Sequence, residues 1–388
     1  MRILIASGIA PPEIGGPATF ISVVVPEFVS RGHDVRVVAF SDAAGPGIDV
    51  GAPVHRISAG TAVSRLAAYA RTYRRLAASA DLVLALGVLL PRVTPRGVPV
   101  VMKVPGDYAW ERAIVKGWIG VDEPLDDFER RRHPWRVQWL KQWRRLEARR
   151  ADRVVVPSRY LERLVTSWAL TPGRVAVVPN AVGPPGDAAR ESPIGLRRSL
   201  GWSADERVLV VAGRLVPWKH VDLVIDAVAD LPGVRLVVAG DGPERPRLVE
   251  RASARAVRAE FVGPQPASAT KALIRAADYL VLYSSYEGLS HTLIEALSLG
   301  TPVVASCRGG NPEIVQDEVN GLLVAHPDVG ALSAALRGAL APARRATLAA
   351  GAQTGLARFD PPRVALALEK IFEAVVNRPT ADESAAAR

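Results

Sequence analysis

Two glutamates eight residues apart lie in the stretch of this chain best suited to binding a polar ligand. Glu287 follows an apolar run over residues 279–283 that predicts a buried strand, and Glu295 falls inside the helix predicted over residues 291–299. Glu295 has apolar neighbours, and a carboxylate in such surroundings must be paired or hydrogen bonded. The two carboxylates predict contacts with ligand hydroxyl groups. A helix cap followed by a stray core glutamate is the alternative.

The residues between the two glutamates predict an anion site. A helix that begins near Ser290 leaves the N–H groups of its first turn unpaired and directs the positive end of its dipole outward. Thr292 and Leu293 lie in that turn, and Gly288 and Leu289 precede it. A phosphate at this helix end with a carboxylate on each side is an arrangement that suits a sugar nucleotide.

Two basic residues on another loop have the charge needed beside a phosphate. Arg214 and Lys219 lie within residues 213–220, which connect a predicted strand over residues 207–212 to a predicted helix over residues 221–230. Cations in this place would neutralise a diphosphate as its bond to a sugar breaks. Two solvated surface cations are an equally simple interpretation of this loop taken alone.

The elements that must position these residues alternate between strands and helices in both halves of the chain. Apolar runs predict strands at residues 2–7, 35–40, 82–86, 98–104 and 153–156, and again at residues 207–212, 234–239, 260–262, 279–283 and 302–305. The Gly- and Pro-rich residues 181–193 indicate a linker. We predict an α/β protein with two Rossmann-like domains, residues 1–183 and 184–360, facing across a cleft.

These motifs resemble those of the retaining glycosyltransferases of family four, which have the GT-B fold. The similarity covers nearly the whole chain and lies in residues 211–220, 240–244, 261–263, 287–295 and 301–306, with residues 11–17 and 31–35 in the first half. The resemblance implies an enzyme of the bacterial glycan or polysaccharide type. The first domain would bind the acceptor, the second would bind the donor, and a helix over residues 361–376 would cross back to the first.

The resemblance also implies a role for each matching residue. Arg214 and Lys219 would bind the donor diphosphate, Glu287 would bind hydroxyls of the donor sugar, and Glu295 would bind the ribose. The backbone of Val262 would lie near the base. The implied donor-binding residues are Gly16, Arg214, Lys219, Val262, Glu287, Gly288, Leu289, Ser290, Thr292, Leu293 and Glu295.

The chain departs from the family pattern in its first half. Many relatives carry a histidine after a strand of this domain, and here Gly106 stands at the matching place. Asp107 is therefore our candidate for the acceptor-side group that receives or orients the hydroxyl proton. Its alternative role is the N-cap of a helix over residues 108–115. Asp107, Arg214, Lys219 and Glu287 are the residues predicted to act in catalysis. His291 is a further candidate beside the donor sugar, unless it is only an exposed helix start.

Composition limits the cofactors and the compartment. The chain contains no Asp-x-Asp sequence, so we predict metal-independent catalysis with no cofactor besides the substrate, a UDP- or GDP-sugar. Cys307 is the only cysteine, which excludes an intrachain disulfide and a cysteine-based zinc site and favours the reducing cytoplasm. The first residues lack the pattern of a signal peptide, and no apolar run is long enough to predict a membrane span.

Positive charge is concentrated in the first half. Residues 1–183 hold 26 basic and 16 acidic side chains, whereas residues 184–388 hold 23 of each. Residues 130–150 contain nine Lys or Arg and only one acid, Glu147. A helix there would align four apolar side chains on one face: Trp135, Trp139, Trp143 and Leu146. Such a face suits peripheral contact with the inner surface of an anionic membrane. We favour the simpler interpretation, in which the tryptophans pack on the sheet of the first domain. Nucleic acid is not predicted as a partner, because no binding module accompanies the charge.

The predicted function is transfer of a sugar, with retention, from a nucleoside-diphosphate sugar to an acceptor hydroxyl. The acceptor stays open between a lipid-linked intermediate, a cell-surface glycan precursor and a small molecule. A sugar-nucleotide 2-epimerase of the same fold is the alternative function. A protein that only binds sugar nucleotides would not require the full set of two cations and two glutamates. A dehydrogenase is disfavoured, since neither half has Gly-x-Gly-x-x-Gly between its first strand and helix.

Overall fold

The chain folds as two compact units. The computed structural model describes residues 1–13, 15–40, 49–58, 60–87 and 94–377. Unit 1 comprises residues 1–111, residues 129–183 and the chain from residue 358, and unit 2 comprises residues 112–128 and 184–357. One break in the chain therefore follows residue 183. Residues 112–128, which the sequence analysis assigned to the first domain, group with unit 2 instead.

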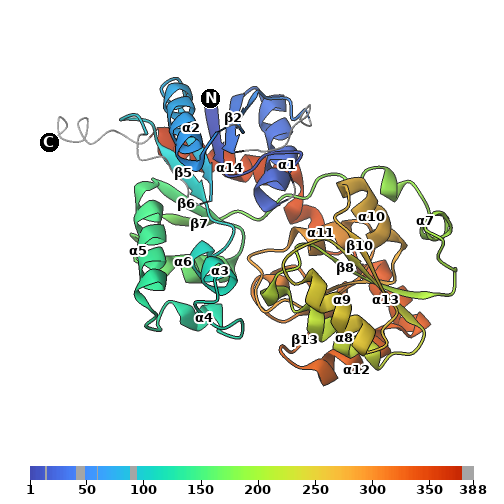
Figure 1. Ribbon diagram of the computed structural model, residues 1–388. Helices are drawn as coiled ribbons and strands as arrows, with labels where there is room; N and C mark the ends of the chain where they lie inside the picture. The colour runs from blue at the N-terminus through green and yellow to red at the C-terminus, as the bar shows by residue number, and fades with distance from the viewer. Residues whose placement is uncertain (14, 41–48, 59, 88–93, 378–388) are drawn as a thin grey trace. The chain divides into compact units, whose positions relative to one another are not determined.

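Unit 1 is built on a parallel β-sheet (Figure 1). Its described strands are β1 Arg2–Ser7, β2 Asp34–Phe40, β3 Val54–Ile57, β4 Leu82–Leu86, β5 Val100–Lys103, β6 Arg153–Val156 and β7 Val175–Val177, in the order β3-β2-β1-β4-β5-β6-β7. Strands β4 and β5 are buried along their whole length, which explains why they are apolar in the sequence up to Lys103, the last residue of β5.

The helices of unit 1 cover this sheet. They are α1 Gly16–Ser30, α2 Ala62–Ala77, α5 Trp135–Arg150, α6 Arg159–Thr166 and α14 Pro361–Val376. Between β5 and α5 the chain forms α3 Tyr108–Val115, which crosses the boundary after residue 111, and α4 Leu125–Phe128, which groups with unit 2. Among the described residues, none of the helices combines the length and the apolar character that crossing a membrane requires.

Helix α14 comes from the far end of the sequence and belongs to unit 1, as predicted. Its buried Leu368 and Phe372 join the core formed with α1, and the rings of Phe372 and Phe28 lie 5.6 Å apart between centroids. Glu369 fixes the rotation of the helix, because its Oε1 accepts hydrogen bonds from Arg31 Nε at 2.6 Å and from His33 Nε2 at 2.8 Å. The C-terminal helix therefore completes the core of the first unit.

Unit 2 contains a second parallel sheet. Its described strands are β8 Arg207–Ala212, β9 Val234–Ala239, β10 Ala259–Gly263, β11 Tyr279–Leu282, β12 Val303–Ser306 and β13 Gly321–Val324, in the order β10-β9-β8-β11-β12-β13. Its helices are α7 Pro193–Ser199, α8 Val221–Ala229, α9 Arg245–Ala254, α10 Ala267–Ala276, α11 His291–Ser298, α12 Val329–Ala339 and α13 Pro342–Gly351. Both units are thus Rossmann-like, and the predicted fold class is confirmed.

The strands that the sequence analysis missed share one property. β3, β7 and β13 each lie at an outer edge of their sheet. β7 has only three residues, and β3 is half-buried throughout. β3 contains His55 and Arg56 and therefore has no apolar run, whereas β7 and β13 are apolar but only three and four residues long.

Helix α5 faces the opposite way from the favoured prediction. Trp135 is 73% exposed and Trp139 is 55% exposed, so these tryptophans do not pack on the sheet, and the core-packing interpretation is wrong. The inward face carries Val137 and Leu140 together with the buried charged residue Arg144. Buried charge is tolerated there because Arg144 is paired with Asp107 and with Glu129, which supplies the compensation that a buried ion requires.

Lys103, the last residue of β5, is a buried cation without such compensation. Its side chain is almost fully buried, and its Nζ has no hydrogen-bond partner among the described residues. Its Nζ lies over the ring of Phe20, 5.0 Å from the ring centroid. Burial lowers the pKa of Lys103 to about 7 from its ordinary value of 10.5.

We expect Lys103→Met to stabilise the protein at neutral pH, by about 3 °C or more in Tm. Between pH 7 and 10.5 the unfolded chain binds a proton that the folded lysine has released, so wild-type stability rises with pH through this window. The gain from the substitution should therefore be largest at and below pH 7 and shrink as the pH rises to 9. Thermal unfolding at several pH values measures it.

Lys370→Met, which removes an exposed lysine of α14, is the matched control. A gap between wild type and Lys103→Met that does not change with pH would show that the lysine is charged in the folded state.

Candidate active site

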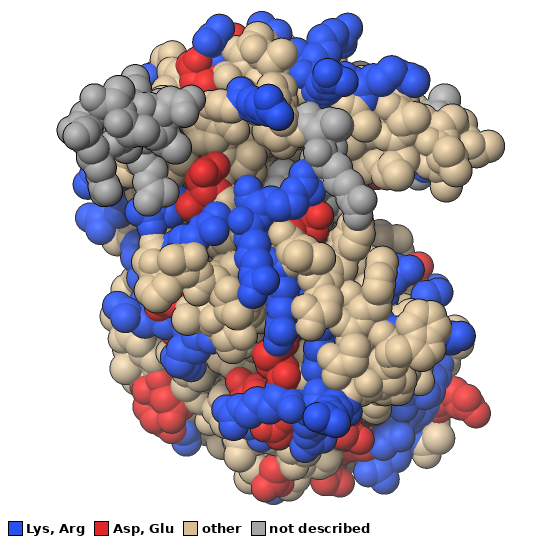
Figure 2. Space-filling model, turned by 90° about the vertical axis from the view of Figure 1, so that its left-hand side faces the viewer, with Lys and Arg blue, Asp and Glu red and all other residues tan. Residues whose placement is uncertain are grey.

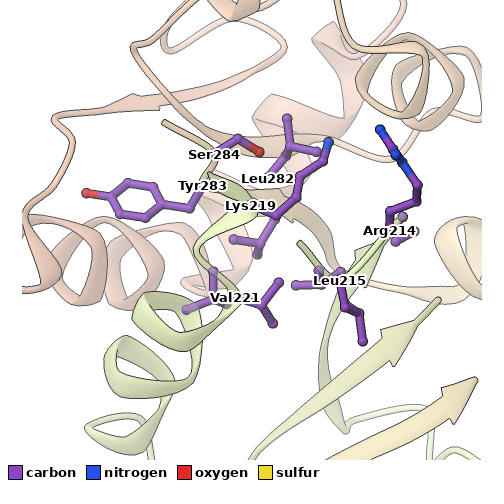
Figure 3. A pocket seen from close by; sticks show the side chains of 12 residues that line it. Arg214, Leu215, Lys219, Val221, Leu282, Tyr283 and Ser284 are labelled. Atoms are coloured by element: carbon purple, nitrogen blue, oxygen red, sulfur yellow. The ribbon is translucent and has the colours of Figure 1, made fainter. Parts of the chain in front are cut away.

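The predicted donor residues of unit 2 lie where the order of its sheet reverses. From β8 the chain continues to β9 and β10 on one side, and it then returns to β11, the neighbour of β8 on the other side. In open parallel sheets the loops at such a switch point diverge, and ligands bind between them at the carboxyl ends of the strands. A pocket lies there, lined by Arg214, Lys219 and Ser284 among others (Figure 3).

The two loops of the switch point are joined by a hydrogen-bonded ion pair. Lys219 Nζ lies 2.5 Å from Glu287 Oε1, and Ser284 Oγ donates to the same oxygen over 2.7 Å. A backbone bond of 2.9 Å from Ser285 N to the carbonyl of Trp218 holds the loops together. Both bonds of the carboxylate use Oε1, which leaves Oε2 without a hydrogen-bond partner among the described residues.

Arg214 lies on the other side of this pocket. It is exposed, and Figure 3 shows its guanidinium and the Lys219 amine extending in the same direction beyond the strand ends. Tyr283 points away from both and donates its hydroxyl to the carbonyl of Asp328 over 3.0 Å. The arrangement therefore gathers two cations and one carboxylate at the same edge of the sheet.

Glycines allow the neighbouring loops to support these residues from behind. A Cβ at Gly240, whose φ is 141°, would collide with the carbonyl of Gly213. A Cβ at Gly310 would collide with the carbonyl of Gly288, and the Gly310 amide donates to the carbonyl of Glu287 over 2.8 Å. The loops after β9 and β12 therefore fix the backbones that carry Arg214 and Glu287.

The start of α11 lies directly after Glu287 and the Gly288–Leu289 turn. Ser290 is the N-cap, and its Oγ accepts from the Leu293 amide over 3.3 Å. A phosphate bound by the Leu293 amide would have to share it with this cap. His291 and Thr292 occupy the first turn and are half-buried. The helix end thus keeps the geometry of an anion site, with one amide already engaged.

Glu295 lies one turn further along α11. It is half-buried, and its carboxylate makes no hydrogen bond or ion pair with the described residues. Burial raises the pKa of Glu295, while the charge of Lys271 acts in the opposite direction. A desolvated carboxylate without a protein partner is costly, so this side chain is available to a ligand that brings hydroxyl groups.

The remaining predicted residues lie outside this group. Val262 is in β10, two strands from β8, and its carbonyl accepts from Gln265 Nε2 over 2.7 Å. Gly16 begins α1 of unit 1, after β1 and at the point where the order of that sheet reverses between β1 and β4. Gly16 is exposed, and a Cβ there would meet no other atom within 4 Å.

Asp107 of unit 1 has a structural role. Its Oδ1 accepts from the amides of Ala109 at 3.0 Å and Trp110 at 3.1 Å, as the N-cap of α3, and its Oδ2 is paired with Arg144. The side chain is 1% exposed. The alternative of a helix cap therefore describes this structure, and its acceptor-side role stays an untested prediction.

Sequence reasoning missed three polar residues that support the site. Ser284 binds Glu287, as described above, and Ser306 Oγ donates to the carbonyl of Ser284 over 2.5 Å. Asn311 Nδ2 donates to Ser306 Oγ over 3.1 Å. All three are fully buried. The available signal was a small polar residue at or just beyond the end of an apolar strand, as with Ser284 after β11 and Ser306 in β12.

Both halves of the chain match known protein families. Residues 195–350 match the family model described as glycosyl transferases group 1, and residues 15–181 match the glycosyl transferase 4-like domain. Each half of the chain therefore matches a glycosyltransferase domain model. The two models together cover the switch-point residues of unit 2 and the strands of unit 1 except β1. These matches do not favour the alternative of a sugar-nucleotide 2-epimerase.

Curated glycosyltransferases resemble part of the chain. The D-inositol 3-phosphate glycosyltransferases of Mycobacterium tuberculosis (strain ATCC 25618 / H37Rv) and Mycobacterium bovis (strain BCG / Pasteur 1173P2) are each 37% identical over 193 residues. The match covers 46% of this chain and 39% of either relative. The similarity thus spans well under half the length of these proteins.

Solved glycosyltransferase structures share the whole GT-B fold. Sucrose-phosphate synthase from Thermosynechococcus elongatus has a TM-score of 0.80 at 20% identity, over 96% of this chain and 99% of that one. Anabaena HepE in complex with UDP-glucose has a TM-score of 0.73 at 20% identity, over 96% and 100% of the two chains. At this identity the likeness shows the fold, and both units of the chain are included in it.

Replacing Glu295 with Gln should separate ligand binding from stability. The amide keeps the shape but loses the charge that strengthens hydrogen bonds to ribose hydroxyls, so we expect donor affinity to fall about 10- to 100-fold. The pKa of Glu295 is raised in the folded protein, so the free energy of unfolding falls as the pH rises above the ordinary pKa of a glutamate. The neutral amide removes this cost, and Tm at pH 7 should not decrease. Calorimetric titration with donor nucleotide measures the affinity.

Glu250→Gln, on the exposed side of α9, is the matched control and should bind donor as wild type does. Unchanged donor affinity in Glu295→Gln would remove Glu295 from the site.

The two roles of Asp107 are separable by Asp107→Asn. Asparagine preserves the capping oxygen but not the charge opposite the buried Arg144, so we expect a loss of about 2 kcal/mol in the free energy of unfolding. Turnover per folded molecule should then be unchanged at temperatures well below Tm. A drop in turnover with unaltered stability would instead assign Asp107 to the acceptor side. Denaturant unfolding and initial rates on the same preparation decide between them.

Proposed function

We propose that the chain is a retaining, metal-independent glycosyltransferase that moves a sugar from a UDP- or GDP-sugar to an acceptor hydroxyl. The observation that carries the proposal is the contact between Lys219 and Glu287 at the switch point of unit 2. A cation and a carboxylate held together there match a ligand that has both negative phosphates and neutral hydroxyls. The proposed setting is the cytoplasm, with peripheral contact at the inner face of the membrane.

Arg214 and Lys219 would neutralise the departing diphosphate. Their charges lie at the edge of the pocket, and the N-terminus of α11 adds the positive end of its helix dipole beside them. In a site shielded from water such fixed charges stabilise the leaving group strongly. The sequence has no Asp-x-Asp pair to hold a divalent ion, and the two cations with the helix end would take over that role.

The two glutamates would hold the sugars on either side of the phosphates. Glu287 has Oε2 available for a hydroxyl of the transferred sugar, beside the Gly288–Ser290 backbone. Glu295 is desolvated and would regain hydrogen bonds from the ribose. The Val262 carbonyl, already bonded to Gln265, would lie at the base. In this proposal, binding replaces the ion pair of Lys219 and Glu287 with separate contacts to phosphate and sugar.

In the proposed step the acceptor oxygen forms a bond to the anomeric carbon while the bond to the β-phosphate oxygen breaks. The electron pair leaves with the nucleoside diphosphate, and the acceptor proton passes to the departing phosphate. Attack from the face of the leaving group retains the anomeric configuration. This route is proposed because the sequence offers no obvious carboxylate nucleophile in the acceptor-binding half.

The proposed acceptor is a lipid-linked or cell-surface glycan precursor bound by unit 1. Its support is the excess of positive charge in residues 1–183, which suits an anionic or membrane-bound acceptor. A small phosphorylated polyol is the competing acceptor, since the mycobacterial relatives are named for D-inositol 3-phosphate. The lysine and arginine excess fits both classes, so the acceptor must be decided by assay.

The proposal is tested with the purified chain, a panel of UDP- and GDP-sugars, and polyprenyl-phosphate-linked or polyol phosphate acceptors. We expect acceptor-dependent release of nucleoside diphosphate, an unchanged rate in EDTA, and a product with the anomeric configuration of the donor by NMR. Lys219→Met should lower kcat about 10²- to 10³-fold. Lys116→Met, on the exposed part of residues 112–128, should not.

Three results would contradict the proposal. An inverted product would exclude the same-face step, and loss of activity in EDTA would exclude metal independence. Conversion of the donor to an epimer without any acceptor would replace the transferase by the 2-epimerase.

A further inference from the structure

The outer face of α5 presents an apolar row to solvent. Trp135 is 73% exposed, Trp139 is 55% exposed and Leu146 is 56% exposed, and the half-buried Trp143 stacks on Trp139 with ring centroids 5.3 Å apart. Successive members are three or four residues apart, so they follow one line along the helix. From Trp135 to Leu146 the row therefore extends over roughly 17 Å along the helix axis.

Exposed arginines surround this row. They lie before the helix, beside the first tryptophan and in the last turn: Arg130, Arg131, Arg132, Arg136, Arg149 and Arg150. The Arg136 guanidinium carbon lies 5.5 Å from the centroid of the Trp135 ring. We call these arginines with Trp135, Trp139, Trp143 and Leu146 the Trp–Arg face. Figure 1 shows α5 on the left, and Figure 2 shows that side, where Lys and Arg gather beside uncharged surface.

Two acids close to this face in the sequence are paired with arginines. Glu147 is buried and pairs with Arg150 at 3.0 Å. Glu129 is bonded to Arg144 and Arg145. The face therefore combines an excess of arginines, one of them paired with an acid, with an apolar row, which is the combination that a negatively charged apolar boundary complements.

The inward contacts of α5 keep this face turned outward. Arg144 is fully buried between Asp107 and Glu129, and its Cζ lies 4.4 Å from the centroid of the Trp168 ring. Lys141 Nζ donates to the carbonyl of Arg131 over 3.0 Å and lies 2.9 Å from His133 Nδ1. Rotating the helix to bury its tryptophans would break these ion pairs and leave buried charges without partners, which is strongly unfavourable.

We propose that the Trp–Arg face docks unit 1 on the surface of an anionic lipid bilayer, with α5 lying in the plane of the headgroups. Indole rings bind at the boundary between headgroups and acyl chains, and arginines pair with lipid phosphates. A second copy of this chain would bring the same positive charge to the contact and be repelled. A nucleic acid would satisfy the arginines but offers no apolar layer for a continuous Trp and Leu row.

This inference deepens the membrane contact of the proposed function but is measurable without any sugar donor. The full chain is sedimented with vesicles of phosphatidylglycerol and phosphatidylcholine in equal parts, or of phosphatidylcholine alone. We expect binding to the anionic vesicles only, weaker binding as salt is raised, and a blue shift of tryptophan emission on binding.

Two variants remove the two components of the face separately. The triple variant Arg131→Gln, Arg132→Gln and Arg136→Gln should weaken vesicle binding about 100-fold. Each of the three cations contributes a similar share of the affinity for an anionic surface, and the variant removes all three. Trp135→Ser with Trp139→Ser should weaken it at least about 10-fold and abolish the blue shift. The controls change unit 2 instead: Arg198→Gln with Arg207→Gln, and Ile194→Ser with Val249→Ser, all at exposed positions.

The outcomes separate docking from the proposed reaction. Equal binding to neutral vesicles, no binding to either kind, or unaltered binding in both face variants would overturn the docking proposal. Binding of an oligonucleotide in a gel-shift assay without vesicle binding would overturn it in favour of nucleic acid. Each variant is first checked for wild-type Tm and donor affinity. Vesicle binding by a chain that lacks transferase activity would leave the docking in place and reject the proposed function.

Discussion

The parallel arrangement of the strands in unit 2, together with the reversal of their order beside β8, is the constraint on which the site depends. Parallel strands release all their following loops at one edge, and the reversal separates the loops after β8 and β11. Lys219 and Glu287 are 68 residues apart in the sequence and come into contact there. Burying either charge alone would be unfavourable, and the contact compensates this cost because each side chain neutralises its partner.

Backbone packing transmits this constraint to the rest of the site. Gly240 and Gly310 allow neighbouring loops to approach so closely that any side chain would collide with the backbones of Gly213 and Gly288. Three buried polar residues, Ser284, Ser306 and Asn311, then connect the ends of β11 and β12. The loops that carry the charged groups are thus supported from behind, which is the form of preorganisation that electrostatic stabilisation of a leaving group requires.

Unit 1 treats buried charge in two contrasting ways. Arg144 is enclosed by two carboxylates and orients α5, so its burial is compensated. Lys103 at the end of β5 has no hydrogen-bond partner among the residues described, and its pKa falls to about 7 as a result. The first arrangement explains why a helix rich in arginine presents tryptophans to solvent. The second leaves the amine at the carboxyl edge of the sheet only partly protonated near neutral pH.

Much of the architecture could be predicted from the sequence because central strands and motif loops are determined locally. The buried strands β4 and β8 are continuous apolar runs, and the spacing of Glu287 and Glu295 places one after a strand and the other in the next helix. The outer strands β3, β7 and β13 were not predicted, since β3 contains His55 and Arg56 and the other two have only three and four residues. The grouping of residues 112–128 with unit 2 likewise has no local signal.

The sequence by itself determined two α/β domains, the positions of the charged loops and the glutamates, and the uneven distribution of charge. Only the tertiary structure decided which of these groups meet. It joined Lys219 to Glu287, left the Glu295 carboxylate without a partner among the described residues, and turned Asp107 toward Arg144. It also decided which side of α5 faces solvent, because the choice depends on Asp107 and Glu129, whose contacts with Arg144 are long-range in sequence. A hydrophobic pattern predicts that the apolar side of a helix is buried. In α5 the buried ion pairs of Arg144 turn the other side inward, and their partners lie too far away in the sequence to be part of that pattern.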